Sequence, residues 1–182
     1  IIGNVQDKNP GDCGGCTPLH YAAINGSFEI CEFIVDMVIN KNPANVLKET
    51  PLHWAAVSGN FETFKLIFQK VNDKNPMDNE GFTPFHGAAC FDHFEMVKFI
   101  IERENNKSPA DNCGFTPLDG ATCFRHFEVC KLIIENMTEV TPADREARLK
   151  IQIRKLLRQQ EICADYARAV MAFRTRMSSC TV

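Results

Sequence analysis

The sequence predicts an all-α solenoid of stacked helix pairs, and three periodic features predict it. The tripeptide Thr-Pro-Leu or Thr-Pro-Phe begins at residues 17, 50, 83 and 116, each time 33 residues after the last. The pair Phe-Glu returns at 28, 61, 94 and 127, and Ile returns at 34, 67, 100 and 133. A fixed period of this length is typical of repeat proteins, in which each unit buries its apolar face against its neighbours.

The first helix of each unit is expected to start at the threonine and run for about ten residues. Threonine suits the N-cap, and proline suits the first helical position because its missing N–H has no partner there. Gly26 and Gly59 are expected to stop this helix in a left-handed conformation. Asp92 and Arg125 stand at the same position in the later units, so we expect those two units to be less regular.

The second helix of each unit is expected to begin at Phe-Glu. Ser27 and Asn60 are expected to cap it, with a glutamate near its positive end. On this helix Phe28, Cys31 and Ile34 lie on one apolar stripe. A stripe this small requires a neighbouring unit to cover it.

The segments Thr17-Pro-Leu-His-Tyr-Ala-Ala23 and Thr50-Pro-Leu-His-Trp-Ala-Ala56, with the 33-residue period, resemble ankyrin repeats. The resemblance covers about residues 8–142. It implies an ankyrin-repeat solenoid with hairpin-like loops built around Asp-x-x-Gly, which here are Asp12–Gly15, Asp78–Gly81 and Asp111–Gly114. The second loop, Asn45-Val-Leu-Lys48, has no glycine, so we expect that hairpin to be distorted.

The period predicts where the units begin and end. Residues 1–8 are expected to be the tail of a truncated preceding repeat, because Ile1 falls on the Ile34 column. The chain is therefore expected to be a fragment of a longer array. Four repeats follow, at about 9–41, 42–74, 75–107 and 108–140, within 9–142. Residues 143–182 are expected to form a basic C-terminal helical extension to about Phe173. We expect this helix to close the solenoid on the fourth repeat rather than form a dimer zipper, and the last residues to be disordered.

Charge is divided unevenly along the chain. Residues 1–142 hold 11 basic and 19 acidic side chains, a net charge of −8, whereas residues 143–182 hold 9 and 4, a net charge of +5. An acidic array argues against a nucleic-acid partner. No apolar run reaches about 18 residues, so no stable membrane insertion is expected. The nine cysteines follow repeat positions and are expected to be reduced, which predicts a cytoplasmic protein, with a nuclear location as the alternative.

Three features of the sequence decide whether it predicts a site of chemistry. Cys13-Gly-Gly-Cys16 with His20 has zinc-like spacing, but no second ligand pair follows, so a structural role is expected. All histidines fall on two repeat columns, which is typical of structural residues. No nucleophile motif, carboxylate pair or phosphate loop is present, so the sequence predicts no enzyme, no cofactor, no metal and no small-molecule substrate.

Residues 148–158 hold five basic side chains and no acidic one, interleaved with leucine and isoleucine. Such a helix is typical of a calmodulin target or of a membrane-surface contact. The simpler interpretation is a cap on repeat four that keeps its charges in water.

The resemblance implies that a protein partner binds the concave face, formed by the hairpin loops and the first helices. The partner-binding residues expected from motif position are Phe82, Phe91, Phe115, Phe124, Asn79, Glu80, Asn112, Cys113, Val46, Leu47 and Glu49. The phenylalanines have two interpretations that the sequence leaves open: anchors on an accessible surface, or packing on adjacent hairpins and on each other. The function expected is a non-catalytic protein–protein interaction scaffold. The alternative is a regulatory or targeting segment of a larger enzyme or channel.

Overall fold

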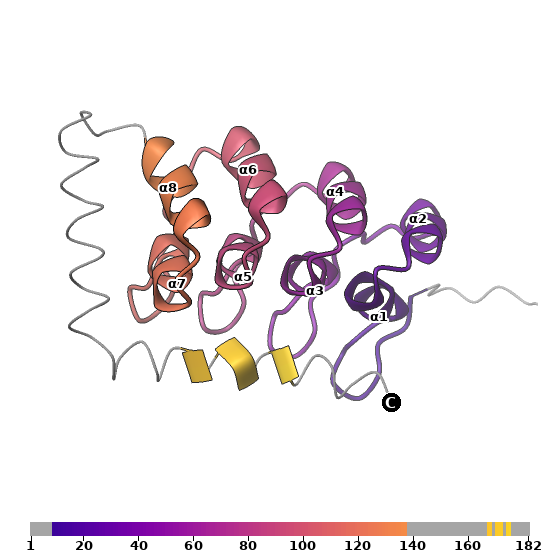
Figure 1. Ribbon diagram of the computed structural model, residues 1–182. Coiled ribbons are helices and arrows are strands. Elements are labelled where there is room, and N and C mark those ends of the chain that lie inside the picture. Colours follow the sequence, from indigo (N-terminus) through magenta and orange to yellow (C-terminus); the bar gives the residue numbers. More distant parts are fainter. Residues whose placement is uncertain (1–8, 138–166, 169, 173, 176–182) are drawn as a thin grey trace, which may run out of the picture.

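The structure is a computed structural model that describes residues 9–137, 167–168, 170–172 and 174–175. It contains four stacked helix pairs, each with an inner and an outer helix (Figure 1). The inner helices are α1 (Pro18–Asn25), α3 (Pro51–Ser58), α5 (Pro84–Cys90) and α7 (Pro117–Cys123). The outer helices are α2 (Phe28–Met37), α4 (Phe61–Lys70), α6 (Phe94–Arg103) and α8 (Phe127–Glu135). No strand occurs in these ranges, and the predicted all-α solenoid is confirmed.

The inner helices end in the left-handed conformation at all four repeats. Gly26 and Gly59 have φ of 66° and 80°, as predicted. Asp92 and Arg125 reach φ of 60° and 64° at the same position, and α5 and α7 are one residue shorter than α1 and α3. A side chain in this conformation costs about 1 kcal/mol or more, so the strain falls on the last two repeats.

The second hairpin is not distorted, so that prediction was wrong. Lys48 has φ of 60°, against 77° to 82° for the glycines of the other loops, and its N–H donates to the Asn45 carbonyl at 2.9 Å. The Asn45 side-chain oxygen accepts the Leu47 and Glu49 N–H groups, both at 2.9 Å. Because asparagine makes the loop bonds that aspartate makes elsewhere, the loop keeps its shape in spite of a left-handed lysine.

A Lys-Asn pair precedes the first three repeat prolines, and Lys74-Asn75 shows that it serves two helices at once. The Lys74 ammonium donates to the Phe68 and Val71 carbonyls at the end of α4. The Asn75 side-chain oxygen accepts the Phe85 N–H at 3.0 Å, at the start of α5. The same roles belong to Lys41 and Lys107, and to Asn9 and Asn42. Both helix ends would otherwise leave backbone groups unpaired, so this pair joins one repeat to the next.

Burial follows the predicted stripe at its cysteine and isoleucine positions, whereas the phenylalanine position is exposed in Phe94 and Phe127, at 37 % and 61 %. Cys31 and Cys130, expected to be small core hydrophobes, are buried, and burial raises the pKa of the Cys31 thiol to about 12. The first outer helix differs from the others, because Phe33 is 68 % exposed whereas its counterpart Phe99 is 7 % exposed. Phe99 lies against rings of the preceding outer helix α4, and no described helix covers α2 in this way.

The predicted C-terminal helix lies mostly outside the described residues, as do the tail 1–8 and the basic stretch 148–158. Residues 167–168, 170–172 and 174–175 are helical. They lie on the side of the array formed by the inner helices, below α7, α5 and α3 in Figure 1. Val170 is 4 % exposed and belongs to the same apolar core as the repeats.

We predict that Arg125→Gly stabilises the chain by about 0.5–1 kcal/mol, because glycine removes the left-handed strain at a modest entropic cost. Urea unfolding followed by circular dichroism measures this change. Arg125 is exposed, so few contacts are lost. The matched control is Gly59→Ala, which should destabilise because its Cβ would lie 2.4 Å from the His93 ring. A loss of stability in Arg125→Gly would contradict the argument.

Candidate protein-binding face

The hairpin loops form a hydrogen-bonded row along one edge of the array. The Val46 N–H donates to the Gly14 carbonyl at 3.0 Å, and the same bond joins each later loop to the one before it. The Asn79 and Asn112 side-chain amides add bonds to the preceding loop, at 3.3 and 2.8 Å. These two residues, predicted as partner contacts, are exposed but also hold the row together.

The tips of this row are accessible, as expected for a contact surface. Val46 is 67 % exposed, Glu80 and Cys113 are exposed, and Leu47 is half-buried. Backbone bonds join the second and third loops to both of their neighbours, and the fourth loop to the third. The structure therefore brings six of the predicted residues, Val46, Leu47, Asn79, Glu80, Asn112 and Cys113, onto one continuous edge.

Phe82 is not on the surface, so the expectation of an accessible anchor there was wrong. It is 7 % exposed, and its ring stacks on His86 with centroids 5.2 Å apart. The Phe82 N–H donates to Asp78 at 2.8 Å and its carbonyl accepts His53 Nε2–H at 3.1 Å, which turns the residue inward.

Glu49 was also expected to be an accessible partner contact, and that expectation was wrong because Glu49 is 1 % exposed. Its carboxylate accepts the Asn45 amide at 2.8 Å and the Trp54 indole N–H at 3.2 Å. Glu49 and Phe82 directly precede the N-cap threonine, a position whose side chain often packs on the first turn of the helix. That position is a weak sequence signal for burial, because Phe115 stands at the same place and is half-buried.

The three remaining phenylalanines are half-buried. Phe91 and Phe124 stack with centroids 6.4 Å apart, as the packing interpretation expected. Each ring also stacks on the histidine two residues later, His93 at 6.4 Å and His126 at 6.0 Å. Phe115 is half-buried at the last loop. These rings form a partly accessible aromatic strip rather than free anchors.

The first histidine column joins neighbouring repeats. In the first repeat His20 Nδ1 accepts the Thr17 N–H at 3.0 Å, and Nε2–H donates to the Glu49 carbonyl of the next repeat at 3.1 Å. His53 and His86 repeat the pattern. Because the carbonyl needs a donor and Nδ1 accepts, each ring is neutral with its proton on Nε2. Burial is the main cause that lowers the pKa of all three rings to about 4.

The second column joins repeats in the opposite direction. His93 Nε2–H donates to the Val57 carbonyl at 3.2 Å, and His126 does the same to Cys90 at 3.0 Å. Asn60 stands in this column and its amide donates to the Ile24 carbonyl at 3.1 Å. The sequence predicted that the Asn60 side chain caps its own helix. That prediction was wrong, because the side chain bonds to the previous repeat instead.

Asp78 carries a buried carboxylate oxygen with no hydrogen-bond partner among the described residues. In the first repeat the equivalent Asp12 accepts the Tyr21 hydroxyl at 2.5 Å. In the third repeat Gly87 stands where Tyr21 does, so that donor is missing. Burial raises the pKa of Asp78 to about 6.

The zinc-like spacing at the start of the array has no matching geometry. Cys13 is exposed, Cys16 is buried, and both ring nitrogens of His20 take part in repeat contacts. No group of three potential metal ligands occurs within the part of the chain that the structure describes.

Residues 1–78 and 65–144 match the family described as "Ankyrin repeats (3 copies)". The chain belongs to the ankyrin-repeat family. Ankyrin repeats typically mediate protein–protein interaction and are usually non-catalytic, so a protein is the class of partner that the family suggests. No curated protein matches this ankyrin chain. In the described ranges, no ankyrin helix is long and apolar enough to cross a membrane.

The buried histidines predict that stability falls as pH falls from 6.5 to about 4. Their folded pKa lies below the unfolded value, so the unfolded chain binds more protons and each ring contributes up to about 1.4 kcal/mol per pH unit. Asp78 opposes one of the three, because its raised folded pKa makes the folded chain hold its proton in this range. For these four groups together, the net slope therefore corresponds to about two rings.

Urea unfolding at a series of pH values measures that slope. His53→Gln is the matched variant, since an amide can accept and donate but does not titrate in this range. It should reduce the slope by about one ring while leaving the fold intact. A slope unchanged by this variant would show that other groups cause the pH dependence.

Proposed function

We propose that this chain is a non-catalytic scaffold that binds a protein partner along the hairpin edge and the adjoining concave face. The concave face is the surface formed by the inner helices and the hairpin loops. The observation that carries the proposal is the bonded row of loops, which holds Val46, Glu80 and Cys113 exposed on a fixed backbone. An exposed edge fixed before binding loses little conformational entropy in a complex.

The edge offers varied chemistry at equivalent positions. Val46 supplies an exposed apolar side chain in the second loop, Glu80 an acidic one in the third, and Cys113 a small one in the fourth. The backbone repeats whereas these side chains do not, so the tips can set specificity while the scaffold sets geometry. Reduced thiols in this array fit a cytoplasmic or nuclear setting.

Site-specific photo-crosslinking tests the proposal in cells. A benzoyl-phenylalanine at position 46 should form a discrete protein adduct. The matched control places the same group at position 33, since Phe33 and Val46 are equally exposed, at 68 % and 67 %, on opposite sides of the array. Position 33 should give no such adduct. Equal adducts at both positions, or none at 46, would refute an edge-specific partner.

We predict that Val46→Asp lowers the affinity for the captured partner about tenfold, because an apolar contact at the tip becomes a charge. The same change should alter the free energy of unfolding by less than about 0.5 kcal/mol, since the side chain is exposed. Titration with the captured partner and thermal unfolding measure the two effects. A large fall in melting temperature with unchanged affinity would remove Val46 from the interface.

A further inference from the structure

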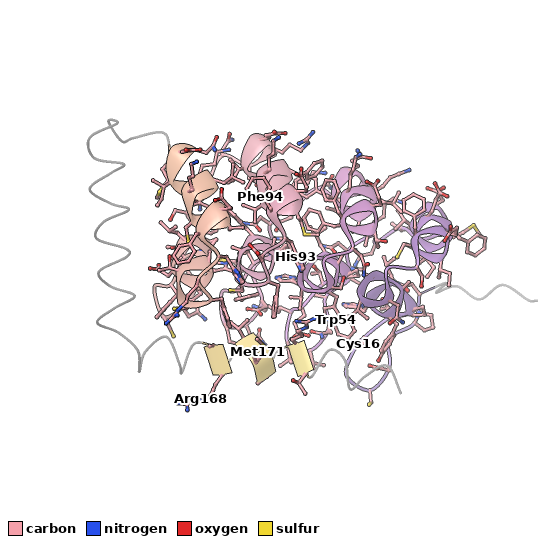
Figure 2. The ribbon with its side chains drawn as sticks, viewed as in Figure 1. Cys16, Trp54, His93, Phe94, Arg168 and Met171 are labelled. Carbon is pink, nitrogen blue, oxygen red and sulfur yellow. The ribbon has the colours of Figure 1, made fainter. Side chains whose placement is uncertain are left out.

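The C-terminal residues make specific contacts on the concave face. Val170 is buried in the core of the array, and the Arg174 guanidinium lies over the Phe91 ring, with its carbon 4.9 Å from the ring centre. Burial lowers the pKa of His93, and the positive charge of Arg174 lowers it further. Arg168 is exposed and points away from the repeats in Figure 2. The segment therefore turns Val170 and Arg174 toward the array, and Arg168 and Met171 are exposed.

The array differs from its own pattern where this segment lies. The first two inner helices carry Tyr21 and Trp54 at one position, and the last two carry Gly87 and Gly120 there. The last two inner helices therefore bring no large side chain to this position, where a Cβ at Gly87 would lie 3.1 Å from the Val57 side chain of α3. All seven residues of α5 are buried, as are seven of the eight in α3.

Charge and hydrogen bonding favour a basic occupant at this place. Residues 1–142 carry a net charge of −8 and residues 143–182 a net charge of +5. The orphan oxygen of Asp78 belongs to the carboxylate whose equivalent in the first repeat bonds Tyr21, a donor that Gly87 does not replace. A donor from a basic helix suits an acceptor that has lost its aromatic partner.

We propose that the concave face over α5 is a docking groove for a basic amphipathic helix, and that residues 167–175 are its intrachain occupant. Val170 and Arg174, one helical turn apart, are the two contacts that hold the segment. While bound, the segment excludes other helices from the groove and leaves the hairpin edge accessible. The inference deepens the proposed function by dividing its surface into an open edge and a self-occupied groove.

A peptide competition on the full chain tests this occupancy. The probe is a fluorescein-labelled synthetic peptide of residues 164–177, followed by fluorescence anisotropy. It should bind the Val170→Asp/Arg174→Glu chain at least about tenfold more tightly than the wild-type chain, in which the tethered segment competes at high effective concentration. The same peptide carrying both substitutions should bind neither chain.

Two phenylalanines map the groove in that double-substituted background. Phe91→Ala should weaken the peptide about tenfold, because it removes the cation–π contact and apolar area. Phe94→Ala is the matched control on the outer helix α6 and should leave the affinity unchanged. Equal binding to the two chains, or equal effects of the two substitutions, would overturn the proposal.

Hydrogen exchange of the wild-type chain tests the same occupancy without any substitution, so a variant that fails to fold cannot affect the result. Amides of residues 170–175 should exchange at least about tenfold more slowly than in the free peptide. Exchange at the free-peptide rate would show that the groove is not occupied. That result, with a position-46 adduct still formed, would refute the groove and leave the edge function standing. Slow exchange without an adduct would refute the edge function alone.

Discussion

A neutral imidazole buried between two repeats is the interaction on which the array depends. Nδ1 of His53 closes the first turn of its own inner helix, and Nε2–H holds the carbonyl at the end of the next loop. Protonation would put a second N–H against the Thr50 N–H, so the bond exists only in the neutral tautomer. The start of an inner helix and the next hairpin therefore cannot move independently. Asp119 takes only the first role in the fourth repeat, because a carboxylate accepts but has no proton to donate.

The histidine bonds between repeats also fix the position of the loops. Each of the last three loops is held at its base by a histidine from the repeat before it and at its tip by a bond to the preceding loop. On the opposite side, the repeated lysine and asparagine pair joins the end of an outer helix to the start of the next inner helix. Contacts of this kind act only between neighbours, so stability is a sum along the stack. Exposed tips on such a frame can vary without cost to the fold.

The two halves of the concave face present different surfaces. Over the first repeats Tyr21 and Trp54 fill it, with ring centroids 5.6 Å apart. Over the later repeats glycines stand in that column, and aromatic side chains occur instead at Phe91 and Phe124, at the ends of the inner helices. Val170, from the C-terminal segment, belongs to the same apolar core as the repeats. The chain thus combines a backbone geometry that repeats in every unit with a local difference in shape. Specificity in a repeat protein depends on such differences.

The sequence by itself determined the helix pairs, the threonine caps of the inner helices and the structural role of the histidines, because the 33-residue period and local helix chemistry act within a few residues. It also placed the loop tips on an accessible edge. Only the tertiary structure decided which loop residues point inward. Phe82 lies inside and bonds to His53, 29 residues before it. Glu49 lies inside and bonds to Trp54, five residues after it. The contact between Arg174 and Phe91 likewise joins residues far apart along the chain, and no periodic pattern encodes such a contact.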